Sequence, residues 1–182
     1  MKEHAINKQN NFISGWYIPE YSCDLILNEF KSRSAEHEYK PDPKNYSGLK
    51  FFSLKEDTIQ HFLSDLQHCL NIYLQRYEFA NNCCKFMLTD ANVQEFKENN
   101  YYNVYHYENT GDKNSINRHL VFITYLNTVH TGGYTEFFYQ NLKIKPEKGL
   151  TLIWPCQWTH AHRGTQTSEK KYICTGWFNF LN

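Results

Sequence analysis

The spacing of apolar residues changes along the chain from helical periodicity in the first half to strand-like alternation in the second. A short apolar run at 12–19 predicts a strand, and segments 20–34 and 55–79 place apolar side chains three and four positions apart, which predicts two amphipathic helices. Ser53 and Glu56 suggest a capping box at the start of the longer helix. Its apolar stripe consists of Ile59, Phe62, Leu63, Leu66, Leu70, Tyr73 and Tyr77.

Between these helices lies a polar stretch that contains Pro41, Pro43 and Gly48. Such residues disfavour regular structure, so we predict an exposed, mobile loop over about 35–49. A connection of this length is longer than two helices need, which is typical of a loop that orders over a bound substrate.

The second half is rich in Tyr, Phe, Ile and Thr, with Gly, Pro and Asn between short apolar runs, which predicts many antiparallel strands in a sandwich or jelly roll. We therefore expect one α+β domain over 1–182, with a helical support and substrate-loop region at 1–82 packed on one sheet of a jelly-roll core at 83–182. The expected strands are 84–88, 92–96, 101–107, 119–126, 133–139, 142–144, 149–154 and 171–180.

Composition narrows the class of protein. Of 182 residues, 41% are hydrophobic and 17% aromatic, which excludes a disordered or fibrous chain. Nineteen basic residues balance nineteen acidic ones, which argues against a partner as anionic as duplex nucleic acid. No apolar stretch reaches the ~20 residues that span a bilayer, and the polar start does not resemble a signal peptide, so we expect a cytoplasmic protein without a membrane partner.

The candidate chemistry begins with His106 and Glu108, an H-x-E pair whose side chains share one face if the segment is a strand. Chance alone supplies about one such pair in this composition, so the pair needs context. His160 and His162 lie further along, just before a predicted strand. Two histidines and a carboxylate form the facial triad of non-haem Fe(II) enzymes, although zinc accepts the same ligands.

A cosubstrate anchor would distinguish an iron oxygenase from a zinc site. Lys171 begins the last predicted strand and can pair with a dicarboxylate inside the fold. A lysine that protects a strand edge is the alternative interpretation.

Several pieces of the sequence, in order, resemble the core of the prolyl 4-hydroxylase-like 2-oxoglutarate oxygenases, of both the collagen and the hypoxia-factor type. The resemblance covers about 92–178 and implies a double-stranded β-helix. It rests on the proximal pair His106 and Glu108 and on RHLVFITYLN (118–127), GGYTEF (132–137), PEKG (146–149), LIWP (152–155), the H-R-G at His162, and KY (171–172) with Trp177.

The resemblance implies that His106 and Glu108 are the proximal metal ligands, where the family usually has Asp in place of Glu. His162 matches the distal ligand better than His160, because it precedes Lys171 by nine positions, whereas His160 precedes it by eleven. We keep His160 as the alternative.

The resemblance further implies that Lys171 pairs with the C5 carboxylate of 2-oxoglutarate. The residues expected to complete this pocket are Tyr125, Thr135, Trp177 and Tyr102. Tyr102 is included because the family often has a tyrosine at the position of Phe96, where this chain needs another donor. Arg118 matches a residue that borders the substrate site. Each aromatic residue could instead be part of the core, and Arg118 could simply pair with a surface carboxylate.

The implied function is an Fe(II)- and 2-oxoglutarate-dependent dioxygenase, similar to procollagen-proline 4-dioxygenase, that hydroxylates peptidyl proline. The expected cofactors are Fe(II), 2-oxoglutarate as cosubstrate, and ascorbate, and the expected partner is a proline-containing peptide or protein. The same scaffold also serves oxygenases of free amino acids, other small molecules and nucleobases, which is the main alternative. A non-catalytic jelly-roll binding module is a third.

Overall fold

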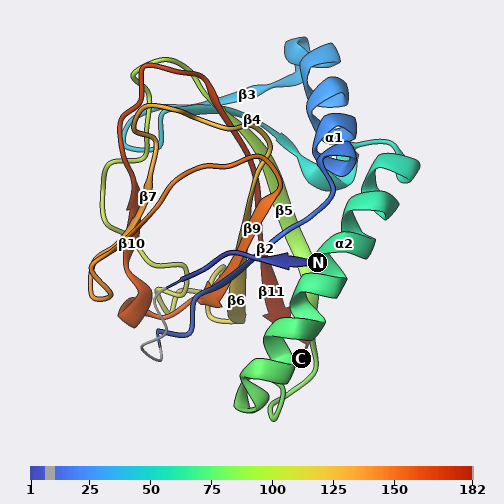
Figure 1. Cartoon of the computed structure of the whole chain (residues 1–182), viewed down its shortest axis with the longest axis vertical. Coiled ribbons are helices and arrows are strands. Elements are labelled where there is room, and N and C mark those ends of the chain that lie inside the picture. Colours follow the sequence, from blue (N-terminus) through green and yellow to red (C-terminus); the bar gives the residue numbers. More distant parts are fainter. Residues whose placement is uncertain (7–10, 182) are drawn as a thin grey trace.

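Two antiparallel sheets face each other in the computed structural model, which describes residues 1–6 and 11–181 (Figure 1). The large sheet has the order β1-β2-β9-β6-β11-β5-β4-β3 and the small sheet the order β10-β7-β8. The predicted α+β jelly roll is therefore confirmed. The large sheet consists of β1 (Lys2–Glu3), β2 (Ser14–Tyr17), β3 (Glu38–Lys40), β4 (Tyr46–Lys50), β5 (Phe86–Phe96), β6 (Arg118–Tyr125), β9 (Leu150–Pro155) and β11 (Lys171–Phe180). The small sheet consists of β7 (Thr135–Phe137), β8 (Leu142–Ile144) and β10 (His162–Gly164).

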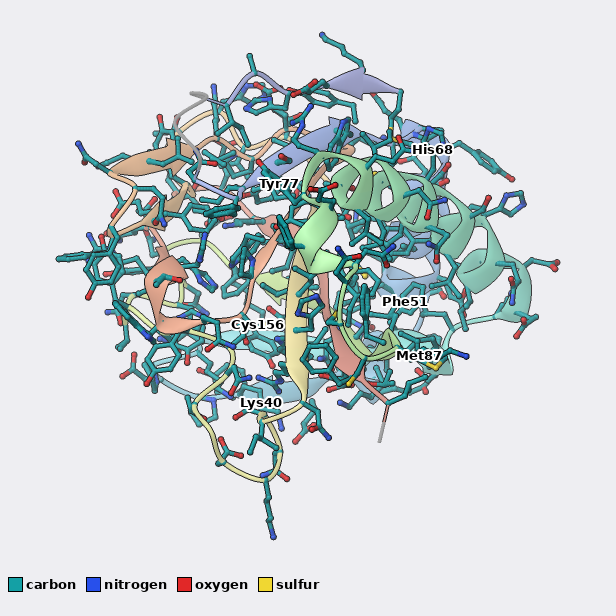
Figure 2. All side chains as sticks on the ribbon, turned by 90° about the horizontal axis from the view of Figure 1, so that it is seen from below. Lys40, Phe51, His68, Tyr77, Met87 and Cys156 are labelled. Carbon is teal, nitrogen blue, oxygen red and sulfur yellow. The ribbon has the colours of Figure 1, made fainter. Side chains whose placement is uncertain are left out.

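Both helices, α1 (Glu20–Ser32) and α2 (Glu56–Arg76), cover the outer face of the large sheet (Figure 1). Strand β6 shows how alternation divides the core. Leu120 and Phe122 pack under the helices, whereas Val121 and Ile123 belong to the cluster between the two sheets. Phe51 is buried beneath α2, and His68 lies on its exposed side (Figure 2).

The predicted capping box is wrong. The residue before α2 is Lys55, and Ser53 lies in a 3₁₀ turn, where its hydroxyl donates to the Lys50 carbonyl at 2.7 Å. The Glu29 carboxylate of α1 instead accepts from the Lys55 amide and the Thr58 hydroxyl, each at 2.8 Å. The cap is therefore a contact between helices, which local sequence does not reveal.

The polar stretch between the helices is not an irregular loop. After a 3₁₀ turn at Ser34–Glu36, strands β3 and β4 form a hairpin that extends the large sheet, with β4 paired to β5. Gly48 permits this pairing, because a Cβ there would lie 3.1 Å from the Val93 carbonyl oxygen. The large sheet therefore contains strands from both predicted regions, 1–82 and 83–182.

Strand β8 spans the predicted 142–144 and β11 the predicted 171–180, whereas 86–88 of the predicted 84–88 and all of 92–96 belong to the single strand β5. The expected strand at 101–107 is wrong, since His106 makes only one isolated bridge, to His162. Alternating residues form a strand only where a neighbour continues the pairing, and here the neighbour is short. No helix in the described ranges is long and apolar enough to cross a membrane.

Candidate metal and cosubstrate site

His106, Glu108 and His162 converge at the start of strand β10, where His106 forms a bridge with His162. His106 and His162 exchange backbone hydrogen bonds of 3.0 and 2.9 Å, and the Glu108 amide donates to the Cys156 carbonyl at 3.0 Å. One ligand atom from each side chain lies within 4.8 Å of the others. Glu108 Oε1 is 3.6 Å from His106 Nε2 and 3.4 Å from His162 Nε2. The backbone pairing therefore delivers three metal-ligand groups to one point.

The hydrogen bonds of the two imidazoles determine which nitrogen is free. Nδ1 of His106 donates to the Val104 carbonyl and Nδ1 of His162 to the His160 carbonyl, each at 2.9 Å, because a carbonyl oxygen can only accept. Burial lowers the pKa of His106 to about 4, and the charge of His162 acts in the same direction, so His106 is neutral at pH 7. Its Nε2 lone pair then faces a carboxylate oxygen, an arrangement that a cation between them stabilises. The residues present fit a divalent metal.

Glu108 is held as a carboxylate by its neighbours. Burial acts to raise its pKa, but the hydrogen bond and charge of His162, the charge of His106 and the hydrogen bond of the Trp177 indole outweigh burial and lower that pKa to about 2. Trp177 Nε1 donates to Oε2 at 2.8 Å, and Arg118 Nη1 lies 3.3 Å from the same oxygen. Because Oε2 is occupied in this way, Oε1 is directed toward the two histidines.

His160 lies apart from this trio. It is buried at the end of a 3₁₀ turn, Trp158–His160, outside strand β10, which begins at His162. Its Nε2 lies 2.8 Å from the Asn11 carbonyl oxygen and its Nδ1 3.0 Å from the Thr159 hydroxyl. These bonds link the turn to the N-terminal segment.

Lys171 is a buried cation in the same cavity. Its Nζ donates to the Gly133 carbonyl at 2.8 Å and lies 5.8 and 5.5 Å from the ring centroids of Phe96 and Tyr125. Among residues 1–6 and 11–181, no carboxylate forms an ion pair with it. Burial lowers the pKa of Lys171 to about 7. An anionic ligand would supply the missing partner.

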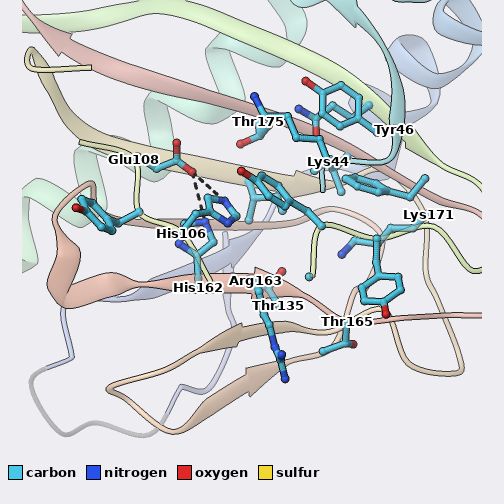
Figure 3. Close-up of a pocket in the computed structure, with 18 of the residues that line it drawn as sticks. Lys44, Tyr46, His106, Glu108, Thr135, His162, Arg163, Thr165, Lys171 and Thr175 are labelled. Atoms are coloured by element: carbon cyan, nitrogen blue, oxygen red, sulfur yellow. Dashed lines mark ion pairs between the residues drawn. The ribbon is translucent and has the colours of Figure 1, made fainter. Parts of the chain in front are cut away.

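A single pocket of about 320 Å³ contains the trio and Lys171 (Figure 3). Thr135 and Tyr102 line it, and the Tyr102 ring stacks on His106 with centroids 4.0 Å apart. Tyr125 is fully buried and donates its hydroxyl to Thr135 Oγ1 at 2.7 Å, so it supports a pocket residue.

Arg118 and Trp177 line the pocket as expected, but they also contact each other. The Arg118 guanidinium carbon lies 3.9 Å from the Trp177 ring centroid, and its Nη1 donates to the Glu108 carbonyl at 2.9 Å. These contacts add a positioning role to the substrate contact that the sequence suggested for Arg118.

Sequence reasoning missed several residues of the pocket wall. Lys44 and Tyr46 come from the β3–β4 hairpin, which we expected to be a loop. Three more come from β5, β6 and β11, whose inward alternation could have identified them; they are Gln94, Ile123 and Thr175.

Comparisons with known proteins find a family model and several solved structures that this chain resembles. The family model described as 2OG-Fe(II) oxygenase superfamily matches residues 91–179. No curated protein matches the chain. Among solved structures, a viral collagen prolyl hydroxylase from Paramecium Bursaria Chlorella virus-1, in a 2OG complex, is similar with a TM-score of 0.73 at 20% identity, covering 94% of this chain and 97% of that chain.

A Pseudomonas putida prolyl-4-hydroxylase is similar with a TM-score of 0.75 at 15% identity, covering 95% of each chain. A Trichoplax adhaerens prolyl hydroxylase, in complex with a hypoxia inducible factor oxygen degradation domain peptide fragment, has a TM-score of 0.71 at 14% identity, covering 94% of this chain and 84% of that chain. At these identities the likeness shows a shared fold.

Proposed function

We propose that the chain, whose residues 91–179 match the family model of the 2OG-Fe(II) oxygenase superfamily, is an Fe(II)- and 2-oxoglutarate-dependent hydroxylase of peptidyl proline. One observation carries the proposal: a trio of two histidines and a glutamate shares a pocket with a buried lysine that has no ion pair within the described residues. A bound metal would be held by the trio, and a bound dicarboxylate would pair with the lysine.

In this proposal His106, Glu108 and His162 hold the iron. Two imidazoles and one carboxylate suit Fe(II) and leave positions open for other ligands. When bound with 2-oxoglutarate, the metal supplies the dioxygen activation that hydroxylation of an unreactive C–H bond requires. The protein contributes the orientation of the ligands, through the Trp177 and Arg118 contacts to Glu108.

Lys171 would bind the far carboxylate of 2-oxoglutarate. A charge-assisted hydrogen bond in a buried site is strong, and it would replace the present bond to a neutral carbonyl. Thr135, whose hydroxyl accepts from Tyr125, stands beside this position as a second group for the same carboxylate.

Two observations support peptidyl proline as the substrate. The similar structures are prolyl hydroxylases, and one of them holds a peptide. A pocket of about 320 Å³ is at the small end of ligand sites, so a cosubstrate and one side chain fit, and the rest of a polypeptide would lie outside.

The test is a turnover assay with Fe(II), 2-oxoglutarate and a library of proline peptides. We expect succinate release coupled to a mass gain of about 16 Da, one oxygen atom, on a peptide. Succinate release without any modified peptide would point to a free amino acid, another small molecule or a nucleobase. No succinate under any condition would refute the enzyme and leave a binding module. Omitting ascorbate tests whether turnover depends on that reductant.

A further inference from the structure

A second lysine, Lys44, borders the pocket that contains the trio and Lys171 (Figure 3). It lies in the turn between β3 and β4 and is exposed, so it stands at the rim of the pocket and not in its depth. The hairpin thus places a positive charge at the entrance to the proposed active site.

The other cationic side chains of the pocket are already paired with a carboxylate or assigned to the cosubstrate. Arg118 is paired with Glu108, and Arg163 is paired with Glu136 through an Nη2–Oε2 distance of 2.9 Å. Lys171 is assigned to the cosubstrate. Lys44 forms no ion pair with any residue in the ranges 1–6 and 11–181.

The turn that presents Lys44 is internally bonded. The Lys44 and Asn45 amides donate to the Pro41 carbonyl at 3.0 and 3.3 Å. The nearest acidic residue in the sequence, Asp42, accepts from the Asn45 side-chain amide at 3.0 Å, and Tyr39 donates to the Asn45 side-chain oxygen at 3.0 Å. Asp42 is therefore engaged with Asn45 and forms no ion pair with Lys44 among the described residues.

The charges in the pocket favour an anionic substrate. Glu108 is the single carboxylate among the described residues that line it, and the metal and Arg118 share that carboxylate. The two carboxylates of 2-oxoglutarate would be matched by the metal and Lys171. Lys44 then leaves the entrance positive, which attracts a carboxylate and disfavours a cation.

We propose that Lys44 selects substrates that carry a carboxylate beside the carbon to be hydroxylated, in a peptide an Asp or Glu next to the target proline. This inference rests on the proposed function and adds a sequence preference to it. The same chemistry is offered by the α-carboxylate of a free amino acid, so the experiment includes free L-proline as a separate arm.

The experiment compares three peptides that differ only in the residues flanking proline, which are Glu, Gln or Lys. For the unmodified chain we expect kcat/KM to fall in that order, by about 5-fold per step, as for one partly exposed charge pair. The difference should lie in KM and shrink at high salt.

Variants at Lys44 identify the source of this preference. Lys44→Gln should make the Glu and Gln peptides equivalent, and Lys44→Glu should favour the Lys peptide. Lys40→Gln is the matched control, because Lys40 lies on the same hairpin, pairs with Glu38 and does not line the pocket. It should retain the original order.

The outcomes separate this inference from the proposed function. Proline peptides that are hydroxylated without regard to flanking charge, or a preference unchanged in Lys44→Gln, would overturn the role of Lys44 and leave the enzyme assignment intact. If the chain hydroxylates free L-proline and no peptide, and Lys44→Gln loses this activity, Lys44 contacts a carboxylate as proposed, but the carboxylate belongs to a free amino acid and the peptide preference is overturned. A chain that consumes no 2-oxoglutarate would overturn both.

Discussion

Replacing Lys171 by Met should stabilise the protein while abolishing its response to 2-oxoglutarate. The buried ammonium group has no carboxylate partner among the described residues, and methionine has a flexible side chain of similar length without a charge. A residue kept for ligand binding at the expense of folding stability would show this combination.

The magnitude follows from the pKa of Lys171. Burial lowers it from 10.5 to about 7, and at about 1.4 kcal/mol per pH unit this difference corresponds to about 5 kcal/mol lost when the charged form is buried. The Met variant lacks the hydrogen bond from Lys171 to the Gly133 carbonyl. Leaving this buried carbonyl without its donor costs about 1–3 kcal/mol. We expect a net gain of about 2–4 kcal/mol in unfolding free energy at pH 7.

The pH dependence gives a sharper test. The unfolded chain keeps the lysine proton up to about pH 10.5, and the folded chain releases it near pH 7, so the unfolded state binds more protons between these values. Through this group the stability of the unmodified protein rises with pH over that window. The part of the stability difference between Lys171→Met and the unmodified protein that comes from burying the charge is therefore largest below pH 7. It falls to about half of that value by pH 9.

Urea unfolding of both proteins at several pH values, without cosubstrate, measures these differences. Lys170→Met is the matched control, because Lys170 is exposed and its removal should leave stability unchanged. With Fe(II) and without oxygen, 2-oxoglutarate should raise the melting temperature of the unmodified protein and not that of Lys171→Met. A Lys171→Met variant whose stability difference is constant with pH would refute the argument from burial.

Three further predictions concern the metal centre and the turn before β7. Alanine in place of His106, Glu108 or His162 should abolish iron-dependent succinate release. His160→Ala should be less stable and still release succinate. Trp177→Phe should weaken metal binding about 10-fold in a metal titration, since Glu108 loses a donor, and an unchanged affinity would contradict its positioning role. Gly132→Ala should lower the unfolding free energy by about 1–3 kcal/mol in urea, because its φ is +72° and a Cβ would lie 2.2 Å from the Gln166 carbonyl oxygen; a variant as stable as the parent would show that the turn can relax.

Local periodicity accounts for what the sequence revealed of the fold. The apolar positions of α2 recur at helical spacing, and those of β6 and β11 alternate, because one face of each element is buried against a neighbour. The spacing of His106, Glu108 and Lys171, together with the family resemblance, was enough to name candidate ligands and an anchor. These features are properties of short segments.

Only the tertiary structure brought together residues that no local pattern relates. Trp177 reaches Glu108 across 69 positions, next to a register shift between Trp177 and Phe178 in the pairing of β11 with β5. His162 joins His106 and Glu108 in the trio, while His160, two residues earlier, is bonded to the N-terminal segment.

Lys44 became a pocket residue because its segment pairs with β5, despite the prolines and glycine that predicted a loop. Strand pairing and register decide such contacts, and they depend on the free energy of the whole sheet, to which a single segment contributes only part. The sequence alone therefore determined the two helices, strands such as β6 and β11, and the candidate ligand types, and the pairing of distant strands determined which side chains share the pocket.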